Sequence, residues 1–555
     1  RGDAFGGQSI DVDSDGDGVP DTTVEGPFDL SVFYRNVPGG NRVRHWDDTL
    51  LDYVAGIRGS VDWLGGMDWE LAAQWSEQTS DMRGRGEALS PFLQAEIDSG
   101  SLDIFGVTGP YGDDMITAAT RATATRSGDA RHRITGGDGQ VTFDAFRLEN
   151  GPVPVALGFE YRDEDYDIAF DEQTAAGAFG GDTADIQPIS GARVVKSLFA
   201  ETSIPLLSRL DANLAARYDD YNDFGTTVNP KVSVAFRPLD TLLLRASYGA
   251  GFRASELELL YEPPSPSQDY FTDSWRCSQT PEGDDNGRPI VPPETLPQFH
   301  PCREQDYQVT FGGNPDLQPE ESDNWTAGVV WSPTPDLSVT VDYYNIKVEE
   351  GIGQDATQLL LDEELSLRQE GETGARVGEV VRFPSGRLRT VFTTYTNLDQ
   401  FETDGLDAEA SYSFAIGRLG DFSARLRWTH VLNWEWDFSG SGTRNWVGEA
   451  GFPQDRGQLT VNWALGDYSA AVVGNYTSDQ DGRHPWIAGD HHLASFTTWD
   501  VQASYSTPWN GQITVGARNV FDRDPPRKTW GNAAYDRSQH EIYGRVPYLR
   551  LEQDF

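Results

Sequence analysis

Cysteine is almost absent from this sequence. The chain has 555 residues and two cysteines, Cys277 and Cys302, which both lie in a polar stretch. An isolated pair of this kind predicts a disulfide formed in an oxidising compartment, and two unrelated free thiols are the alternative. The chain also begins at Arg1 without a methionine or a signal peptide, which we interpret as a processed or partial polypeptide.

Long hydrophobic runs are missing as well. No uninterrupted apolar stretch approaches the ~18 residues that a transmembrane helix requires. This does not exclude a membrane β-barrel, because only alternate residues of a barrel strand face lipid. The 16 Trp, 21 Tyr and 27 Phe residues fit the aromatic belts that such barrels place at both membrane interfaces.

Basic residues are also scarce, with 43 Lys and Arg against 88 Asp and Glu and a formal net charge of −45. This balance disfavours nucleic acid as a partner, because its binding depends on Lys and Arg side chains that neutralise phosphate. Sequence patterns of catalysis are missing too. We find no glycine-rich phosphate loop between a strand and a helix, no Gly-x-Ser-x-Gly motif and no nucleophile–base pair, so we do not expect an enzyme.

What the chain does contain is a long series of alternating segments. Residues 210–218 place Leu210, Leu214 and Tyr218 on one face and Asp211 and Arg217 on the other, which is the period of a β-strand. The same period recurs in segments of about ten residues or more, the length of a tilted membrane strand. We expect strands at 50–63, 67–83, 136–150, 153–167, 193–207, 210–223, 226–239, 242–255, 321–334, 337–352, 400–414, 421–438, 455–466, 468–480, 497–509, 511–524 and 544–555.

The connections between these segments alternate in length. Very short ones, such as 151–152 and 240–241, are followed by mostly long ones, such as 84–135, 256–320 and 353–399. Outer-membrane barrels have short periplasmic turns and long extracellular loops, and a soluble sandwich has no such requirement. The sequence therefore predicts an all-β fold, a transmembrane antiparallel β-barrel of about 17 strands.

The last segment, 544–555, is typical of the closing strand of such a barrel. Leu549, Leu551 and Phe555 lie on one face and Arg550 and Glu552 on the other, and the chain ends on an aromatic residue. The edge strand of a soluble sandwich is the alternative interpretation of this segment alone.

Several motifs resemble one known family. The sequence NPDLQPEES at 314–322 resembles the NPxLxPExS box of TonB-dependent receptors, and residues 248–261 resemble their GFRAPSLxELY segment, with Ser255 in place of the usual proline. Residues 218–232 and 519–526 are similar to two further boxes of these receptors, a hairpin containing NPK and an NLFDxxPP motif. Together the motifs span most of the chain in the family's order.

The resemblance implies the rest of the architecture. It implies a 22-stranded receptor barrel, of which residues 50–555 form about 17 strands and residues 1–49 an extracellular loop segment. It also implies an upstream plug that contacts the TonB complex. We expect the outer membrane of a Gram-negative bacterium, extracellular loops, and contacts with membrane lipid and lipopolysaccharide. We further expect the remaining barrel strands, or a second chain, to pair with 50–63, because an open strand edge in lipid is costly.

An acidic segment near the N-terminus predicts a calcium site. Asp13, Asp15, Asp17 and Asp21 fall at positions 1, 3, 5 and 9 of a calcium-loop pattern, with a glycine at position 6. A backbone carbonyl at Val19 completes the expected ligands. The bidentate glutamate at position 12 is missing, and a disordered acidic loop is the alternative.

Ligand-binding candidates lie in the long loops. His300 falls in the interval where haem receptors of this family place an iron ligand, but a solvated loop histidine is the interpretation we favour, so haem is not expected. Trp275 and Tyr307 are candidates to stack on a sugar or a peptide.

Three functions follow as alternatives. The resemblance favours active import of a scarce nutrient, energised by TonB. A passive porin without a plug, and a calcium-binding surface adhesin, remain open. The sequence does not identify the substrate, although the acidic loops disfavour a strongly anionic ligand unless calcium bridges it.

Overall fold

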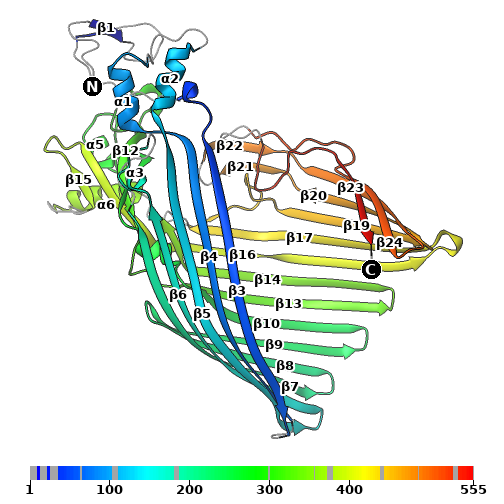
Figure 1. The fold of residues 1–555 in the computed structure, drawn as a ribbon. Coiled ribbons are helices and arrows are strands. Elements are labelled where there is room, and N and C mark those ends of the chain that lie inside the picture. Colours follow the sequence, from blue (N-terminus) through cyan, green and yellow to red (C-terminus); the bar gives the residue numbers. More distant parts are fainter. Residues whose placement is uncertain are drawn as a thin grey trace.

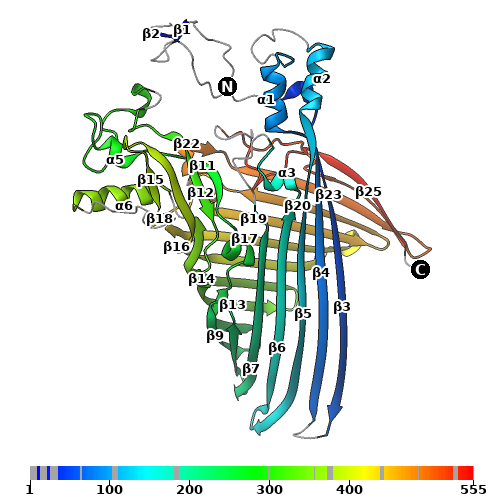
Figure 2. The same ribbon diagram turned by 60° about the vertical axis from the view of Figure 1, so that its left-hand side comes forward.

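The protein is dominated by one large antiparallel sheet, which Figures 1 and 2 show as a curved wall. The computed structural model describes residues 9–12, 22–25, 36–62, 66–102, 111–179, 187–297, 300–354, 357–371, 379–437, 443–484, 487–528 and 535–553. Seventeen strands of the sheet pair in chain order, each with the strand before it. The predicted all-β barrel fold and its strand number are thus confirmed.

The seventeen strands fall into two runs separated by the loop between β10 and β13. The first run is β3 (Val43–Val61), β4 (Met67–Ala88), β5 (Thr123–Leu148), β6 (Gly151–Phe170), β7 (Ile189–Leu207), β8 (Leu210–Tyr221), β9 (Gly225–Leu239) and β10 (Leu242–Arg253). The second run is β13 (Glu320–Thr334), β14 (Leu337–Gln354), β16 (Leu388–Ala415), β17 (Asp421–Asp437), β19 (Asp455–Leu465), β20 (Tyr468–Thr477), β23 (Phe496–Ser506), β24 (Gly511–Arg518) and β25 (Val546–Gln553).

Shorter elements lie outside this series. Four short strands attach to it: β11 (Ser265–Phe271), β12 (Gln305–Gly312), β15 (Val380–Arg382) and β18 (Arg444–Asn445). Two separate pairs are β1 (Ser9–Val12) with β2 (Thr22–Glu25), and β21 (Gln480–His484) with β22 (Ile487–Leu493). The helices are η2 (Val37–Gly39), α1 (Ser90–Asp98), α2 (Asp113–Arg121), α3 (Glu172–Ala175), α4 (Leu257–Tyr261), α5 (Ser274–Cys277), η3 (Pro293–Thr295), α6 (Thr357–Gln369) and η4 (Gly417–Leu419). No helix within the described ranges has the length and apolar character needed to cross a membrane.

Short and long connections lie on opposite rims of the sheet. The turns at 149–150, 208–209 and 240–241 lie on the short-turn rim, and the long connections that carry α1, α2 and α4 to α6 lie on the other, the long-loop rim (Figures 1 and 2). Several strands run further toward the long-loop rim than the sequence predicted. β3 begins at Val43 and β5 at Thr123, inside segments we expected to be loops.

The physical reason is that the alternation of apolar residues ends before the hydrogen-bonded ladder does. In the extension of β5, Arg131 pairs with Asp167 at 2.8 Å and Arg133 with Glu77 at 2.6 Å. These ion pairs occupy the face that is apolar lower down, so the strands continue without the pattern that predicts them.

The two faces of the sheet differ in chemistry. The outward face is apolar and carries aromatic pairs at two heights: Tyr248 with Trp325 and Trp428 with Tyr476 toward the long-loop rim, and Phe414 with Phe422 and Tyr468 with Tyr505 toward the short-turn rim. The alternate residues form the polar, lumenal face, where ion pairs join strands. Arg427 reaches Glu409 on the neighbouring strand, and two pairs span one intervening strand: Arg217 with Glu160 and Arg245 with Asp342. Apolar-out and polar-in is the pattern of a membrane barrel.

β3 and β25 are the outermost strands of the series. Both belong to one barrel-type sheet in which they stand next to each other in strand order. However, no residue-by-residue register joins β3 to β25 in the described part of the chain. The β3 edge exposes Leu50, Tyr53 and Val54, each by more than half of its surface.

Candidate functional site

Two long loops fold together into a compact unit above the sheet, which we call the cap (residues 257–317 and 357–399). The β11–β12 hairpin joins the upper part of β16 through β12, in the only parallel pairing among the described strands. β15 pairs with the same part of β16 from the other side. A buried apolar cluster lies between these strands and α6: Phe271, Val309, Leu360, Leu361, Val380, Leu388 and Val391.

A buried ion-pair network fixes the two loops to each other. Arg382 donates hydrogen bonds to Asp273 from one loop, at 2.8 and 2.9 Å, and to Glu364 from the other, at 2.6 and 2.8 Å. Both carboxylates are fully buried. Burial alone would lower the pKa of Arg382, but Glu364 and Asp273 together raise it, so the guanidinium is held in its charged form. Arg368 adds a second cation beside Glu364, at 2.8 Å.

The two aromatic residues predicted to bind a ligand contact other side chains of the cap. Trp275 has the guanidinium groups of Arg368 and Arg382 over its ring, at 4.5 and 4.9 Å from the centroid. Tyr307 stacks on Phe271 with ring centroids 4.7 Å apart. Burial, with the negative charge of Asp273, raises the pKa of the Tyr307 hydroxyl to about 12. A ligand role for either residue stays a prediction.

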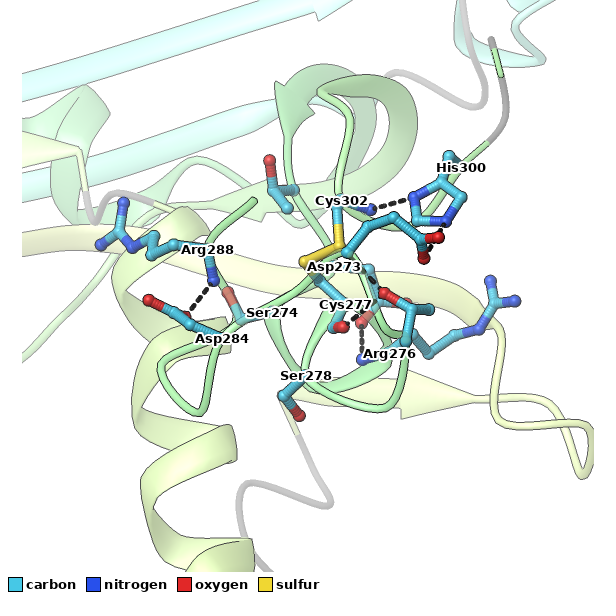
Figure 3. The surroundings of a disulfide bond; sticks show 12 residues. Asp273, Ser274, Arg276, Cys277, Ser278, Asp284, Arg288, His300 and Cys302 are labelled. Carbon is cyan, nitrogen blue, oxygen red and sulfur yellow. Dashed lines mark hydrogen bonds and ion pairs between the residues drawn. A yellow bond between two sulfur atoms is a disulfide. The ribbon is translucent and has the colours of Figure 1, made fainter. Parts of the chain in front are cut away.

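The predicted disulfide is present in the cap. Cys277, at the end of α5, is bonded to Cys302, and both side chains are buried beside Leu296 (Figure 3). His300 lies next to the bond, where its Nδ1 accepts a hydrogen bond from the Cys302 backbone N–H at 3.2 Å and its Nε2 lies 3.4 Å from Glu282. Both ring nitrogens therefore have partners within the loop, the arrangement of a structural histidine.

The motif around Ser255 anchors the cap to the sheet. Arg193 of β7 is buried and donates a hydrogen bond to the carbonyl of Ser255 at 2.6 Å and another to Asp223 at 2.7 Å. The same guanidinium lies over the rings of Tyr221 and Phe224, 5.5 and 5.9 Å from their centroids. Since Ser255 uses its carbonyl for this contact, the residue that replaces the usual proline keeps the connection.

The second motif meets the first at the same place. Asn314 donates hydrogen bonds from its backbone N–H to Leu259 and from its side chain to the carbonyl of Tyr395, both at 2.9 Å. Leu317 packs against Leu257 and Leu260 in a buried cluster. The two sequence boxes are therefore the structural junction between the barrel wall and the cap.

A cavity opens on the lumenal face below the long-loop rim. It has a volume of about 340 Å³ and lies where β14, β17 and β19 meet the loop between β17 and β19. Aromatic and aliphatic side chains dominate its wall, with one cation at the edge. Its lining is Tyr344, Thr429, Val431, Trp434, Val447, Gly451, Phe452, Pro453, Gln454 and Arg456.

The predicted calcium ligands Asp13, Asp15, Asp17, Val19 and Asp21 lie outside the described residues, so that site stays a prediction. Within the described residues, no group of three or more His, Cys, Asp or Glu side chains is arranged to hold a metal ion. The sequence did not indicate Arg193, Arg382, Trp434 or Arg456. Arg193 and Arg382 act through partners from other strands or loops, and Trp434 and Arg456 meet only in the wall of the cavity, so a single sequence contains no local signal for them.

The fold, with its apolar outward face and polar lumen, is that of an outer-membrane β-barrel. A family model described as "TonB dependent receptor-like, beta-barrel" matches residues 2–520. The chain therefore belongs to the TonB-dependent receptor β-barrel family, which implies the outer membrane of a Gram-negative bacterium. No curated protein sequence matches the chain significantly.

Solved structures share the fold at low sequence identity. The siderophore receptor PirA from Acinetobacter baumannii is 13% identical with a TM-score of 0.56, and the match covers 92% of this chain and 63% of that one. A mutant of the ferric enterobactin receptor PfeA from Pseudomonas aeruginosa is 14% identical (TM-score 0.56; 88% and 62%). The outer-membrane transporter YddB from Escherichia coli is 11% identical (TM-score 0.60; 92% and 63%). The chain thus spans less than two thirds of these proteins.

Proposed function

We propose that this chain forms the barrel wall and ligand-facing cap of a receptor that imports a scarce nutrient across the outer membrane. In this proposal the long-loop rim is extracellular, and the TonB complex drives transport through an upstream plug. The observation that carries the proposal is the family match over residues 2–520. The cap supports it, because its loops are fixed by a disulfide and a buried ion-pair network before any ligand arrives.

Ferric siderophores are the first substrate class to test, because one structural relative is named a siderophore receptor and another a ferric enterobactin receptor. The test uses the full-length protein in a host without its own siderophore receptors. We expect growth on a supplied ferric siderophore in iron-limited medium, and loss of that growth when tonB is deleted. Import that persists without TonB would support the passive porin instead. Adhesion without import, lost when calcium is chelated, would support the adhesin.

The missing register between β3 and β25 among the described residues leads to a second part of the proposal. Unpaired backbone groups in lipid cost several kcal/mol each, so we propose that upstream sequence of the same polypeptide pairs with residues 43–61. A photo-crosslinking amino acid at Val54, followed by mass spectrometry, tests this in cells. Cross-links to upstream peptides are expected. Cross-links mainly to 546–553 would mean that β3 pairs with β25 instead.

A further inference from the structure

Two hollows lie one above the other on the outward face of the sheet, where β9, β10, β13 and β14 are neighbours (Figure 1). The lower hollow has a volume of about 560 Å³, and its wall is mainly apolar, with Val232, Val234, Ala246, Tyr248, Trp325 and Ala327. The upper hollow lies nearer the long-loop rim, has a volume of about 540 Å³, and includes the carboxylates of Glu321, Asp323 and Glu349. The registers place both sets on the face of the Tyr248–Trp325 pair, so neither hollow opens into the lumen.

The lower hollow exists because two small residues meet on this face. Ala246 and Ala327 stand directly opposite each other on β10 and β13. Larger side chains flank them in the same row, Val234 on β9 and Tyr343 on β14. The Tyr248 and Trp325 rings, with centroids 4.4 Å apart, close the upper end. The result is an apolar depression much larger than the ~150 Å³ cavity that holds benzene, so it has room for an alkyl chain.

The position of the two hollows matches the layers of a membrane. Aromatic pairs such as Tyr248–Trp325 mark the boundary between hydrocarbon and headgroups on the long-loop side. The lower hollow therefore faces the acyl chains, and the upper hollow faces the headgroups. From Ala246 to Phe252, strand β10 rises about 20 Å, so one lipid molecule can reach both hollows.

The upper hollow carries uncompensated negative charge. Glu321 and Glu349 stand directly opposite each other on β13 and β14, an arrangement of like charges that destabilises a sheet. Lys347 pairs with Glu349, but the Glu321 carboxylate has no hydrogen-bond or ion-pair partner among the described residues. Asp323 accepts a hydrogen bond from the Tyr248 hydroxyl at 2.6 Å, which places a further carboxylate directly above the aromatic pair. A cationic group at this place would relieve the repulsion.

We propose that this part of the outward face binds a membrane lipid with a primary-amine headgroup. One acyl chain lies in the lower hollow over Ala246 and Ala327, and the ammonium group donates hydrogen bonds to Glu321 and Glu349 in the upper hollow. Charge complementarity selects the amine, because the carboxylates repel an anionic headgroup and accept strong hydrogen bonds from an ammonium. The inference goes beyond the proposed function and does not depend on which molecule the receptor imports.

The test uses phosphatidylethanolamine as the probe. It is titrated into delipidated full-length protein in detergent micelles, and bound lipid is counted by native mass spectrometry. Phosphatidylglycerol with the same acyl chains tests the charge, and phosphatidylcholine tests the N–H donors. Ala327→Leu fills the lower hollow, and Glu321→Gln combined with Glu349→Gln removes two charges from the upper hollow.

Each of these variants has a matched control on the same outward face. Ala424→Leu enlarges an alanine of β17 that lies two residues from the outward Phe422. Asp47→Asn combined with Asp81→Asn removes another pair of directly opposed carboxylates, on β3 and β4. Heat-modifiable migration in gels shows that each variant is a folded barrel.

We expect wild type and both controls to bind phosphatidylethanolamine equally, and about tenfold more tightly than phosphatidylglycerol. Phosphatidylcholine should also bind more weakly, because its headgroup has no N–H donor. Ala327→Leu should bind every lipid several-fold more weakly. The double glutamate variant should bind phosphatidylethanolamine about tenfold more weakly and no longer distinguish it from phosphatidylglycerol.

Three results would overturn the inference. The first is equal phosphatidylethanolamine affinity in wild type and both hollow variants. The second is wild type that binds phosphatidylglycerol as tightly as phosphatidylethanolamine. The third is a wild-type dimer that Ala327→Leu dissociates, because a second copy of the chain, and not a lipid, would then cover the lower hollow.

Discussion

Arg382 and Asp273 form a two-point ion pair inside the cap, with Nη2–Oδ1 and Nη1–Oδ2 distances of 2.8 and 2.9 Å. The residues are 109 positions apart, and each belongs to a different long loop. Glu364 shares the same guanidinium from α6. One buried side chain thus joins α6 and β15 of one loop to Asp273 of the other.

Replacing Arg382 by alanine is expected to loosen the cap and leave the barrel folded. The change leaves two carboxylates buried without their main cation, which costs about 3–5 kcal/mol for a broken buried pair. Amide hydrogen exchange should rise in β11, β12 and α6 and remain unchanged in β17. Arg389→Ala, an exposed position on β16, is the control. Unchanged exchange in the cap of Arg382→Ala would contradict this account.

Removing the disulfide is expected to destabilise the same loop. Cys277 and Cys302 are 25 residues apart, and closing a loop of that length stabilises by roughly 3 kcal/mol in the chain-entropy model. In protein taken from membranes, alkylation without reductant should label neither thiol, and labelling after reduction should be complete. The Cys277→Ser/Cys302→Ser variant should show faster proteolysis between 278 and 301. Full labelling without reductant would mean that the bond does not form.

Much of the barrel could be predicted from the sequence because water and lipid impose a period of two on it. β8 and β10 begin at the residues that the alternation indicates, Leu210 and Leu242. The cap could not be predicted in this way. Its interior depends on Arg382 reaching Asp273 across 109 residues, and on a parallel β12–β16 pairing that joins only residues 309–312 to 391–394, too short a stretch to show a pattern.

The lumenal cavity could not be predicted from the sequence either, because its residues come together only in the fold. Trp434 and Arg456 stand in ordinary strand positions, and nothing in their neighbours along the chain marks them. They become a candidate site only when β17 and β19 lie side by side and Phe452 covers them. The motif around Ser255 is the opposite case. Its pattern was visible in the sequence, but its contact with Arg193 was not.

Arg193→Ala is expected to weaken the attachment of the cap to the barrel wall. The substitution removes the donor to the Ser255 carbonyl and leaves Asp223 without its cation, a loss of about 3–5 kcal/mol for a buried charge pair. Ser255→Ala removes only a 3.3 Å hydrogen bond to Gln318, so less than about 1.5 kcal/mol is expected. Denaturant unfolding of both variants checks this order. Equal effects would show that the arginine is not the anchor.

Acid is expected to loosen the loop at 535–545. Burial, with a smaller effect of Arg456, lowers the pKa of His540 below its ordinary value of 6.5, although Asp536 opposes the shift. The unfolded loop therefore binds the proton more readily, so the stability from neutral His540 is present above pH ~6.5 and declines as the pH falls below it. Hydrogen exchange of this loop, corrected for intrinsic rates, should rise between pH 7.5 and 5.5. His540→Phe should abolish the change, and a persisting change would assign it to another group.

Calcium is expected to bind the acidic segment at 13–21 with oxygen ligands from Asp13, Asp15, Asp17, Asp21 and the Val19 carbonyl. Without a cation, so many carboxylates in one short segment repel one another. Calorimetric titration of calcium should give heat with wild type and much less with Asp15→Ala, which removes a central ligand. Negligible heat in both proteins would exclude the site.

Strand β16 runs without interruption from the short-turn rim into the cap, over residues 388–415. Its lower part pairs with β14 and β17, and its upper part carries β12 and β15. The cap is therefore attached to the barrel wall through a continuous strand of that wall, in addition to the junction at Ser255 and Asn314. A ligand that displaces the cap therefore has to bend β16. The register shifts near Gly351 and between Asp404 and Gly405 are the places where the paired strands can bend most easily. Because β16 is continuous, a force on the cap reaches the barrel wall through this strand.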